Sequence, residues 1–372
     1  MKNAVQGGIL TFQEYLKAKN NEWKHIPLHI AVTGNSGVGK SSFINALRGV
    51  RKGQKGFAEV NVTETTTDLK GYPHPQNKSL VFWDMPGVGT PKYPKKDYLK
   101  AVSFEKYDFF LILTCGRFTE NDLWLANQVR SQEKMFYFIR TKIGFDVYNE
   151  QRNDPKMHES GITLRIRDDC IRKLKKANFG NPSVFLIDNY DIVKYDFGRL
   201  VDTLLTHLPE KKREALALSL TVMTKEVILA KRHALRKRIV VISFASALGG
   251  AIPFPGLGAT IDTVLIYEEA QEYKRQFGLT EDALLKSNPK YAQLIKDKYV
   301  QNIAQLVATV TIDEAAENAV KFGLPILGSI LSGTVSYGVS VTVLWRLLNS
   351  MADDAIDLNE DMITGLSSDT GV

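Results

Sequence analysis

Eight consecutive residues near the start of the chain have the types and the spacing that hold a polyphosphate. They form a Walker A sequence, Gly34-Asn35-Ser36-Gly37-Val38-Gly39-Lys40-Ser41, and Ser42 follows it. The glycines let backbone N–H groups curl around phosphate oxygens. Lys40 is expected to bridge the β- and γ-phosphates and to stabilise charge during phosphoryl transfer, while the Ser41 hydroxyl ligates Mg²⁺. The sequence therefore predicts a site for a nucleoside triphosphate.

A second candidate motif lies about forty residues further on. The apolar run Leu80–Trp83 ends in Asp84-Met85-Pro86-Gly87. Asp84 is expected to hold Mg²⁺ through water, and the Gly87 amide to contact the γ-phosphate. Alone, this sequence is also an ordinary strand-to-turn ending, but its distance from the Walker A sequence favours Walker B followed by switch II. The next residue is Val88, which cannot orient an attacking water.

A polar, threonine-rich segment lies between these two motifs. It runs from Thr63 to Asp68, where a nucleotide-sensing switch I belongs. The Thr66 hydroxyl, with Thr65 as the second candidate, is expected to complete the Mg²⁺ shell when the γ-phosphate is present. The alternative is a threonine-rich turn that holds no ligand.

The elements expected around these motifs alternate between strands and helices. Apolar runs predict strands near 28–33, 80–84, 108–114, 135–140 and 183–187. With helical stretches between them, this order predicts an α/β fold, a mostly parallel sheet with helices on both faces. From Leu208 onward the strand signals vanish and helical patterns take over.

These motifs resemble those of the immunity-related (interferon-inducible) GTPases, which belong to the dynamin-like group of P-loop GTPases. The resemblance covers roughly residues 10–350, and its most specific part is Gly34–Gly49. Further segments also resemble the family: Glu64-Thr65-Thr66 followed by Tyr72–Pro75, Phe82–Gly87, Arg140-Thr141-Lys142, Val184–Ile187 with Asn189, and the proline-rich Ala251–Leu257.

The resemblance implies roles for residues that composition and spacing do not assign. Thr141, Lys142 and Asn189 would belong to the base-binding part of a GTP site. Glu64 would take part in activation across a dimer of GTPase domains, and Lys40 places the chain with the members that carry Lys at that P-loop position. An all-α domain built from both ends of the chain would accompany the GTPase domain.

One departure from the family concerns base recognition. The family motif is Thr-Lys-x-Asp, but here the fourth position is Gly144. The missing carboxylate would accept two hydrogen bonds from guanine, so its loss is expected to weaken guanine selectivity. Asp146, or Asp188 where the family usually has Ser, would supply a carboxylate if its loop bends suitably.

Length and composition suit two globular domains. The chain has 372 residues, of which 44% are hydrophobic and 24% charged. Cys115 and Cys170, without a signal peptide, indicate reduced thiols in a cytoplasmic protein. The expected parts are an N-terminal helical segment (1–25), a P-loop GTPase domain (26–207), a helical domain (208–352) and an acidic polar tail (353–372).

The net charge of +7 concentrates partly between Lys211 and Arg238. Leu216, Leu220 and Val227 recur there at helical spacing, which predicts one helix with a buried stripe and a basic exterior. That exterior is either a solvated face or a surface attracted to anionic lipids. Nucleic-acid binding ranks below both, because no recognised module accompanies the charge.

Two stretches without charged residues, 239–261 and 322–345, are as long as membrane-spanning helices. Glycines and prolines interrupt both, which favours buried helices of a helical domain. The alternative is a hairpin inserted into one leaflet of a membrane.

These features together predict a Mg²⁺-dependent enzyme that binds and hydrolyses GTP. By resemblance it would form dimers or oligomers through its GTPase domain and associate peripherally with intracellular membranes. A nucleotide-dependent assembly scaffold with weak guanine selectivity and little turnover is the alternative. Gly144 and Val88 favour that alternative, whereas the intact Lys40, Ser41 and Asp84 favour an enzyme.

Overall fold

The computed structural model describes residues 15, 18–60, 68–221, 223–250, 258–287, 309–310, 312–321 and 331–368. The chain divides into two compact units. Trp23–Val222 contains the sheet and is called the sheet unit below. Met1–Glu22 together with Met223–Val372 is called the helical unit, because every element described in it is a helix.

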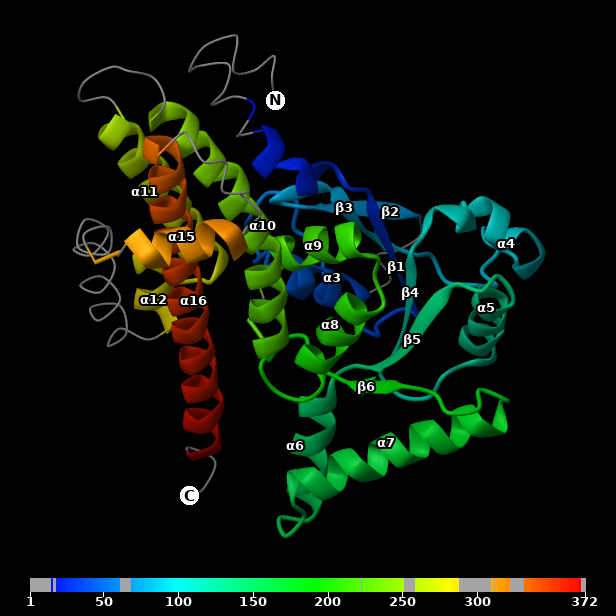
Figure 1. Ribbon diagram of the computed structural model, residues 1–372. Coiled ribbons are helices and arrows are strands. Elements are labelled where there is room, and N and C mark those ends of the chain that lie inside the picture. The colour runs from blue at the N-terminus through cyan, green and yellow to red at the C-terminus, as the bar shows by residue number, and fades with distance from the viewer. Residues whose placement is uncertain are drawn as a thin grey trace. The chain divides into compact units, whose positions relative to one another are not determined.

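The sheet unit is built on six strands in the order β2-β3-β1-β4-β5-β6 (Figure 1). Among the strands that the structure describes, only the β2–β3 pair is antiparallel. β4 is buried along its whole length, as expected of a parallel strand covered on both faces. The strands are β1 (Leu28–Thr33), β2 (Lys70–His74), β3 (Asn77–Asp84), β4 (Phe109–Thr114), β5 (Met135–Arg140) and β6 (Val184–Leu186).

Helices pack on both faces of this sheet (Figure 1). One face carries α4 (Lys95–Ala101), α5 (Glu120–Ser131), α6 (Ile143–Asn153) and α7 (Glu159–Lys176). The other face carries α3 (Lys40–Arg48), α8 (Phe197–Thr206) and α9 (Glu210–Ser219). Two short 3₁₀ helices, Glu22–His25 and Phe104–Lys106, complete the elements described around the sheet. The α/β prediction with helices on both faces is therefore confirmed.

Alternate residues of a strand supply the two cores. Phe110 and Ile112 of β4 join clusters that include Leu125 and Ala126 of α5. Tyr137 of β5 faces the opposite side, where its ring lies 5.9 Å from that of Phe185. The period-two alternation of the strands thus fixes which helix covers which face.

Strand β2 is an element that the sequence analysis missed. Its sequence Lys-Gly-Tyr-Pro-His has no apolar alternation and contains both glycine and proline. Proline is tolerated in a strand only where its missing N–H is not needed, and β2 forms an edge of the sheet.

The helical unit contains α10 (Lys225–Gly250), α11 (Gly258–Gln276), α12 (Glu281–Ser287), α15 (Ile312–Lys321) and α16 (Leu331–Ser368). α10, α11 and α16 pack on one another. A buried ion pair joins α10 to α11, where Arg238 donates from Nε and Nη2 to Glu269 at 2.8 and 2.7 Å. Arg238 also donates to the backbone oxygen of Asn20 at 3.0 Å, so both ends of the chain contribute to this unit.

The helical segments differ from expectation in three places. The single basic helix predicted across 211–238 is wrong, because α9 ends at Ser219 and α10 begins at Lys225. The Thr224 hydroxyl accepts a hydrogen bond from the Val227 N–H at 3.1 Å, which caps the new helix.

The boundary between the units falls at Met223 instead of Leu208, since α9 packs on β1 and β3. Residues 353–368, expected as a loose tail, continue α16.

The two charge-free stretches are described only in part. Residues 239–250 end α10, residues 258–261 begin α11, and residues 331–345 belong to α16. The remaining positions, 251–257 and 322–330, lie outside the described residues. Within the described part of the chain, no helix has both the length and the apolar character that crossing a bilayer requires.

Candidate functional site

The Walker A loop follows β1 and leads into α3, as the sequence predicts. Gly34 has φ +139°, and a Cβ atom added to it would fall 2.2 Å from the backbone oxygen of Leu113. Gly39 has φ +91°, and its added Cβ would fall 2.9 Å from Nδ2 of Asn189. Any larger residue would push the loop away from β4 at Gly34, and away from the loop after β6 at Gly39.

Lys40 is the first residue of α3, and only 7% of it is exposed. Its Nζ donates to the backbone oxygens of Gly34 and Asn35, at 3.0 and 3.2 Å. The ammonium group thus curls back over the loop that precedes the helix, which is the position from which it would contact a bound polyphosphate.

The Walker A serine and the Walker B aspartate meet at the same place. The Ser41 hydroxyl donates to Oδ2 of Asp84 at 3.2 Å, and Asp84 is 1% exposed at the end of β3. Hydroxyl and carboxylate oxygens are the ligands that Mg²⁺ prefers. The expected switch I residues Glu64, Thr65 and Thr66 lie outside the described residues.

Side chains from outside the motif hold the backbone of switch II. The Tyr98 hydroxyl donates to the backbone oxygen of Pro86 at 2.9 Å, and burial raises the pKa of Tyr98, which keeps the hydroxyl protonated. The Thr90 hydroxyl donates to the oxygen of Gly87 at 3.2 Å, and Asn121 Nδ2 to that of Val88 at 2.7 Å. The sequence analysis missed these residues, because nothing in their local sequence indicates the contact.

The side chain of Val88 packs against the hydrophobic cluster under α4 and α5. This agrees with the expectation that residue 88 does not position water.

Two residues expected near the base also contact the phosphate loop. The buried Thr141 hydroxyl donates to the backbone oxygen of Val38 at 2.7 Å. Asn189 Nδ2 donates to the backbone oxygen of Gly39 at 3.0 Å. These contacts attach the loops after β5 and β6 to the Walker A loop. The exposed Lys142 follows Thr141 as the N-cap of α6, with φ +61°.

The two candidate replacement carboxylates lie in different surroundings. Asp146 forms an ion pair with Arg140, with 2.5 Å between Oδ2 and Nη2. Burial raises the pKa of Asp146, and the Arg140 guanidinium partly opposes that rise. Asp188 instead accepts hydrogen bonds from the backbone N–H groups of Gly144 and Tyr190, at 3.1 and 2.9 Å.

Asp188 also lines a cavity of about 380 Å³ formed by α6, the start of α7 and the loop after β6. Gly144, Tyr148 and Tyr190 are among its other lining residues. Cavities of this size accept small-molecule ligands. The loops that line it are the ones attached to the Walker A loop.

Comparison with known proteins agrees with this geometry. The family model described as Interferon-inducible GTPase (IIGP) matches residues 1–361. This chain belongs to that family. It is therefore a GTP-binding GTPase, and the recognition made from the motifs is confirmed.

Several curated relatives resemble the chain over most of its length. Interferon-inducible GTPase 5 of Rattus norvegicus is 35% identical over 342 residues, covering 88% of this chain and 74% of that protein. T-cell-specific guanine nucleotide triphosphate-binding protein 2 of Mus musculus is 34% identical over 366 residues, covering 96% of this chain and 86% of that protein. Among solved structures, NFeoB from S. thermophilus bound to GDP.AlF4- and K+ is 16% identical, with a TM-score of 0.32 over 73% of this chain and 91% of that one. A TM-score at that level supports no conclusion here.

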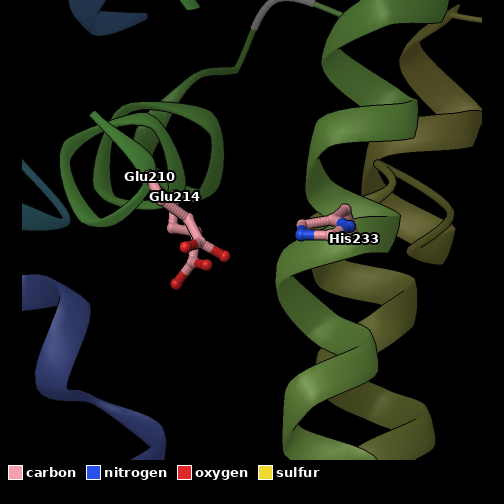
Figure 2. Close-up of side chains that lie close together, drawn as sticks. All are labelled: Glu210, Glu214 and His233. Carbon is pink, nitrogen blue, oxygen red and sulfur yellow. The ribbon is translucent and has the colours of Figure 1, made fainter. Parts of the chain in front are cut away.

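Outside this site, Glu210 and Glu214 lie one turn apart on α9, and their carboxylates lie close together (Figure 2). His233, also drawn in Figure 2, belongs to α10 of the other unit. Two carboxylates one turn apart on a helix do not by themselves form a metal site.

Proposed function

We propose that this family member is a Mg²⁺-dependent GTPase that assembles through its sheet unit and acts at intracellular membranes. The observation that supports its enzymatic part best is the arrangement of Lys40, Ser41 and Asp84 around the start of α3. The relatives include a protein named for guanine nucleotide triphosphate binding, which supports GTP as the nucleotide.

The residues at the site fit Mg²⁺. Ser41 offers a hydroxyl oxygen beside the buried carboxylate of Asp84, and a divalent cation there would compensate that buried charge. Ser41 would hold the ion directly and Asp84 through water, with Thr66 as the expected third residue. The ion would supply neutralisation of charge on the β- and γ-phosphates.

The chain's own residues would do the remaining work of hydrolysis. Lys40 binds the phosphates, and the backbone N–H groups at the N-terminus of α3 orient them. The backbone of Gly87, held through its neighbours Pro86 and Val88, presents its amide to the γ-phosphate. Since Val88 packs into a hydrophobic cluster, a group from a second molecule is needed to position water, and Glu64 is the proposed contributor.

Assembly through the sheet unit is supported by exposed aromatic side chains near the nucleotide. Tyr148 and Tyr190, at the cavity, are 61% and 85% exposed, and Phe145 of α6 is 63% exposed. Exposed aromatic residues that gather on one surface are typical of protein interfaces.

The basic residues between 211 and 238 support membrane contact less than their number in the sequence suggests. Most of the basic residues between 211 and 238 contact other groups of their own unit. The pairs are Lys212 with Asp108, Arg213 with the oxygens of Leu205 and Leu208, Lys225 with Glu360, Lys231 with the oxygen of Gln276, Arg232 with Asp353, Arg236 with the Trp345 ring, and Arg238 with Glu269. The support for membrane contact is therefore the two charge-free stretches, 239–261 and 322–345.

A dilution series of GTP hydrolysis tests the proposal. Phosphate release per molecule should rise with protein concentration, because a partner molecule completes the site. A specific activity that stays flat across the series would remove the dimer from the mechanism.

The rival function is an assembly scaffold with little turnover. Single-turnover phosphate release, with protein in excess of GTP, distinguishes it from a GTPase. A scaffold would bind the nucleotide and release no phosphate on the time scale of assembly. Mass spectrometry of the nucleotide that copurifies with the protein would identify the base and the hydrolysis state. Release from membranes by a carbonate wash would separate peripheral contact from insertion.

A further inference from the structure

Asp188 occupies the space that a side chain on residue 144 would need. A Cβ atom added to Gly144 falls 2.6 Å from Oδ2 of Asp188, much closer than real contacts allow. The same oxygen accepts a hydrogen bond from the Gly144 N–H, while Oδ1 accepts one from the Tyr190 N–H. Two backbone amides therefore fix this carboxylate at the cavity, and glycine at position 144 leaves room for it.

The other carboxylates near the cavity have charged partners or lie at its exposed rim. Glu159 accepts from the Lys194 ammonium at 2.8 Å, and Asp191 is exposed and accepts from the Lys194 backbone N–H at 3.1 Å. Asp146 is paired with Arg140. Each oxygen of Asp188 has room for two hydrogen bonds and holds one backbone N–H, so the carboxylate retains acceptor positions for a ligand.

The chain segments that line the cavity also contact the loop that would hold the phosphates. Asn189, the residue after Asp188, donates to the backbone oxygen of Gly39 in the Walker A loop. Thr141, which lies three residues before Gly144 in the chain, donates to the backbone oxygen of Val38 in the same loop. A nucleotide whose phosphates occupy the Walker A loop therefore has space for its base next to Asp188.

We propose that Asp188 is the residue that reads guanine in this protein, and that Gly144 is the residue that makes room for it. The inference rests on the proposed function, since it assumes that GTP binds at this site. Guanine presents N1–H and a 2-amino group on one edge, two donors that suit a carboxylate, whereas adenine has an unprotonated nitrogen at N1. GTP is then strongly favoured over ATP, in place of the weakened selectivity that Gly144 alone would give.

The variant Asp188→Asn tests this assignment, because it should lose affinity for GTP and gain affinity for XTP. Xanthine has a carbonyl oxygen where guanine has its 2-amino group, so a carboxamide can accept from N1–H and donate to that oxygen, while it loses one of the two backbone N–H contacts that Asp188 accepts. The affinity for GTP should fall roughly 100-fold, and XTP should become the preferred nucleotide. Calorimetric titration of the full chain with GTP, XTP and ATP measures all three affinities.

Two further variants make the result specific. Asp191→Asn removes the same charge from the same cavity, and it should retain the preference for GTP. Asp146→Asn tests the competing carboxylate, and a switch to XTP in that variant would overturn the assignment. An Asp188→Asn protein that still prefers GTP would also overturn it while leaving GTP binding intact. Failure of the wild-type chain to bind GTP would remove the proposed function itself.

The steric half of the inference has its own test. Gly144→Asp alone places a second carboxylate against Asp188, so GTP affinity or folding should be lost. Adding Asp188→Ser makes room again and leaves one carboxylate, now on α6, so GTP affinity should return to within about tenfold of the wild type. A double variant as impaired as Gly144→Asp would refute the exchange of positions, whether or not Asp188→Asn folds.

Discussion

Tyr98→Phe is expected to slow GTP hydrolysis, because the buried Tyr98 hydroxyl donates a hydrogen bond to the switch II backbone. The Tyr98 side chain is 0% exposed, and its hydroxyl is 2.9 Å from the backbone oxygen of Pro86. Removing that hydroxyl leaves a buried carbonyl group without its donor, which costs about 1–3 kcal/mol. The peptide between Pro86 and Gly87 can then turn toward another donor, and the Gly87 amide turns with it.

The size of the effect follows from that cost. If the lost free energy falls on the transition state, each 1.4 kcal/mol slows the reaction about tenfold. We expect kcat to fall by about tenfold to 100-fold, with little change in KM, because Lys40 and the Walker A loop still bind the phosphates. Single-turnover hydrolysis of GTP measures the rate, and urea unfolding measures the stability.

Tyr107→Phe is the matched control. Tyr107 is also buried in the cluster under α4, and its hydroxyl donates to the backbone oxygen of Val102 at 2.8 Å, outside switch II. Both variants should lose similar stability, and only Tyr98→Phe should lose rate. A Tyr98→Phe protein that is less stable but hydrolyses GTP at the wild-type rate would refute the role assigned to Tyr98.

Three other changes test the site and the helical unit. Lys40→Ala should weaken GTP binding by about 100-fold or more, because charge-assisted contacts to the phosphates are lost; unchanged uptake of a fluorescent GTP analogue would contradict the Walker A assignment. Asp84→Asn should raise the Mg²⁺ concentration that gives half-maximal hydrolysis, as a magnesium titration would show, and an unchanged requirement would exclude Asp84 from the metal site. Burial lowers the pKa of Lys231 from 10.5 to about 7, so the charged side chain destabilises the folded state most below pH 7. Lys231→Met should therefore raise the thermal midpoint most at pH 6, with a gain that shrinks as the pH rises toward 10; a gain independent of pH would contradict the buried charge.

Local sequence predicted well where the Walker A loop and Asp84 lie in the fold. The Walker A loop, the strand before it and the Asp84 turn each depend on contacts between near neighbours or on parallel strands that meet at one edge. Those are the patterns that hydrophobic periodicity and glycine spacing report. The prediction that Ser41 and Asp84 share a metal site remains a prediction, but the two residues are indeed adjacent.

The base end could not be predicted in the same way. That residue 144 lacks a carboxylate is visible in the sequence, but the hydrogen bond between Gly144 and Asp188 joins residues 44 positions apart. Whether Asp146 or Asp188 faces the cavity depends on the Arg140 ion pair, which a sequence pattern does not report. Tyr98 and Asn121 were missed for the same reason, because each supports switch II from a later helix, through a contact that local sequence does not report.

The basic segment shows why a charge count along a helix overstates its attraction to a membrane. Basic residues that face solvent and basic residues that contact groups of their own unit have the same sequence pattern. They differ only in whether a contacting side chain or backbone oxygen lies nearby in the fold. Here Arg238 is paired with Glu269 inside the helical unit, whereas the exposed Arg236 guanidinium, 4.9 Å from the centre of the neutral Trp345 ring, keeps its charge. Lys231 donates to the oxygen of Gln276 within the same unit. A charge paired with a carboxylate adds little long-range field, so the paired part of this segment should attract a membrane less than its charge count suggests.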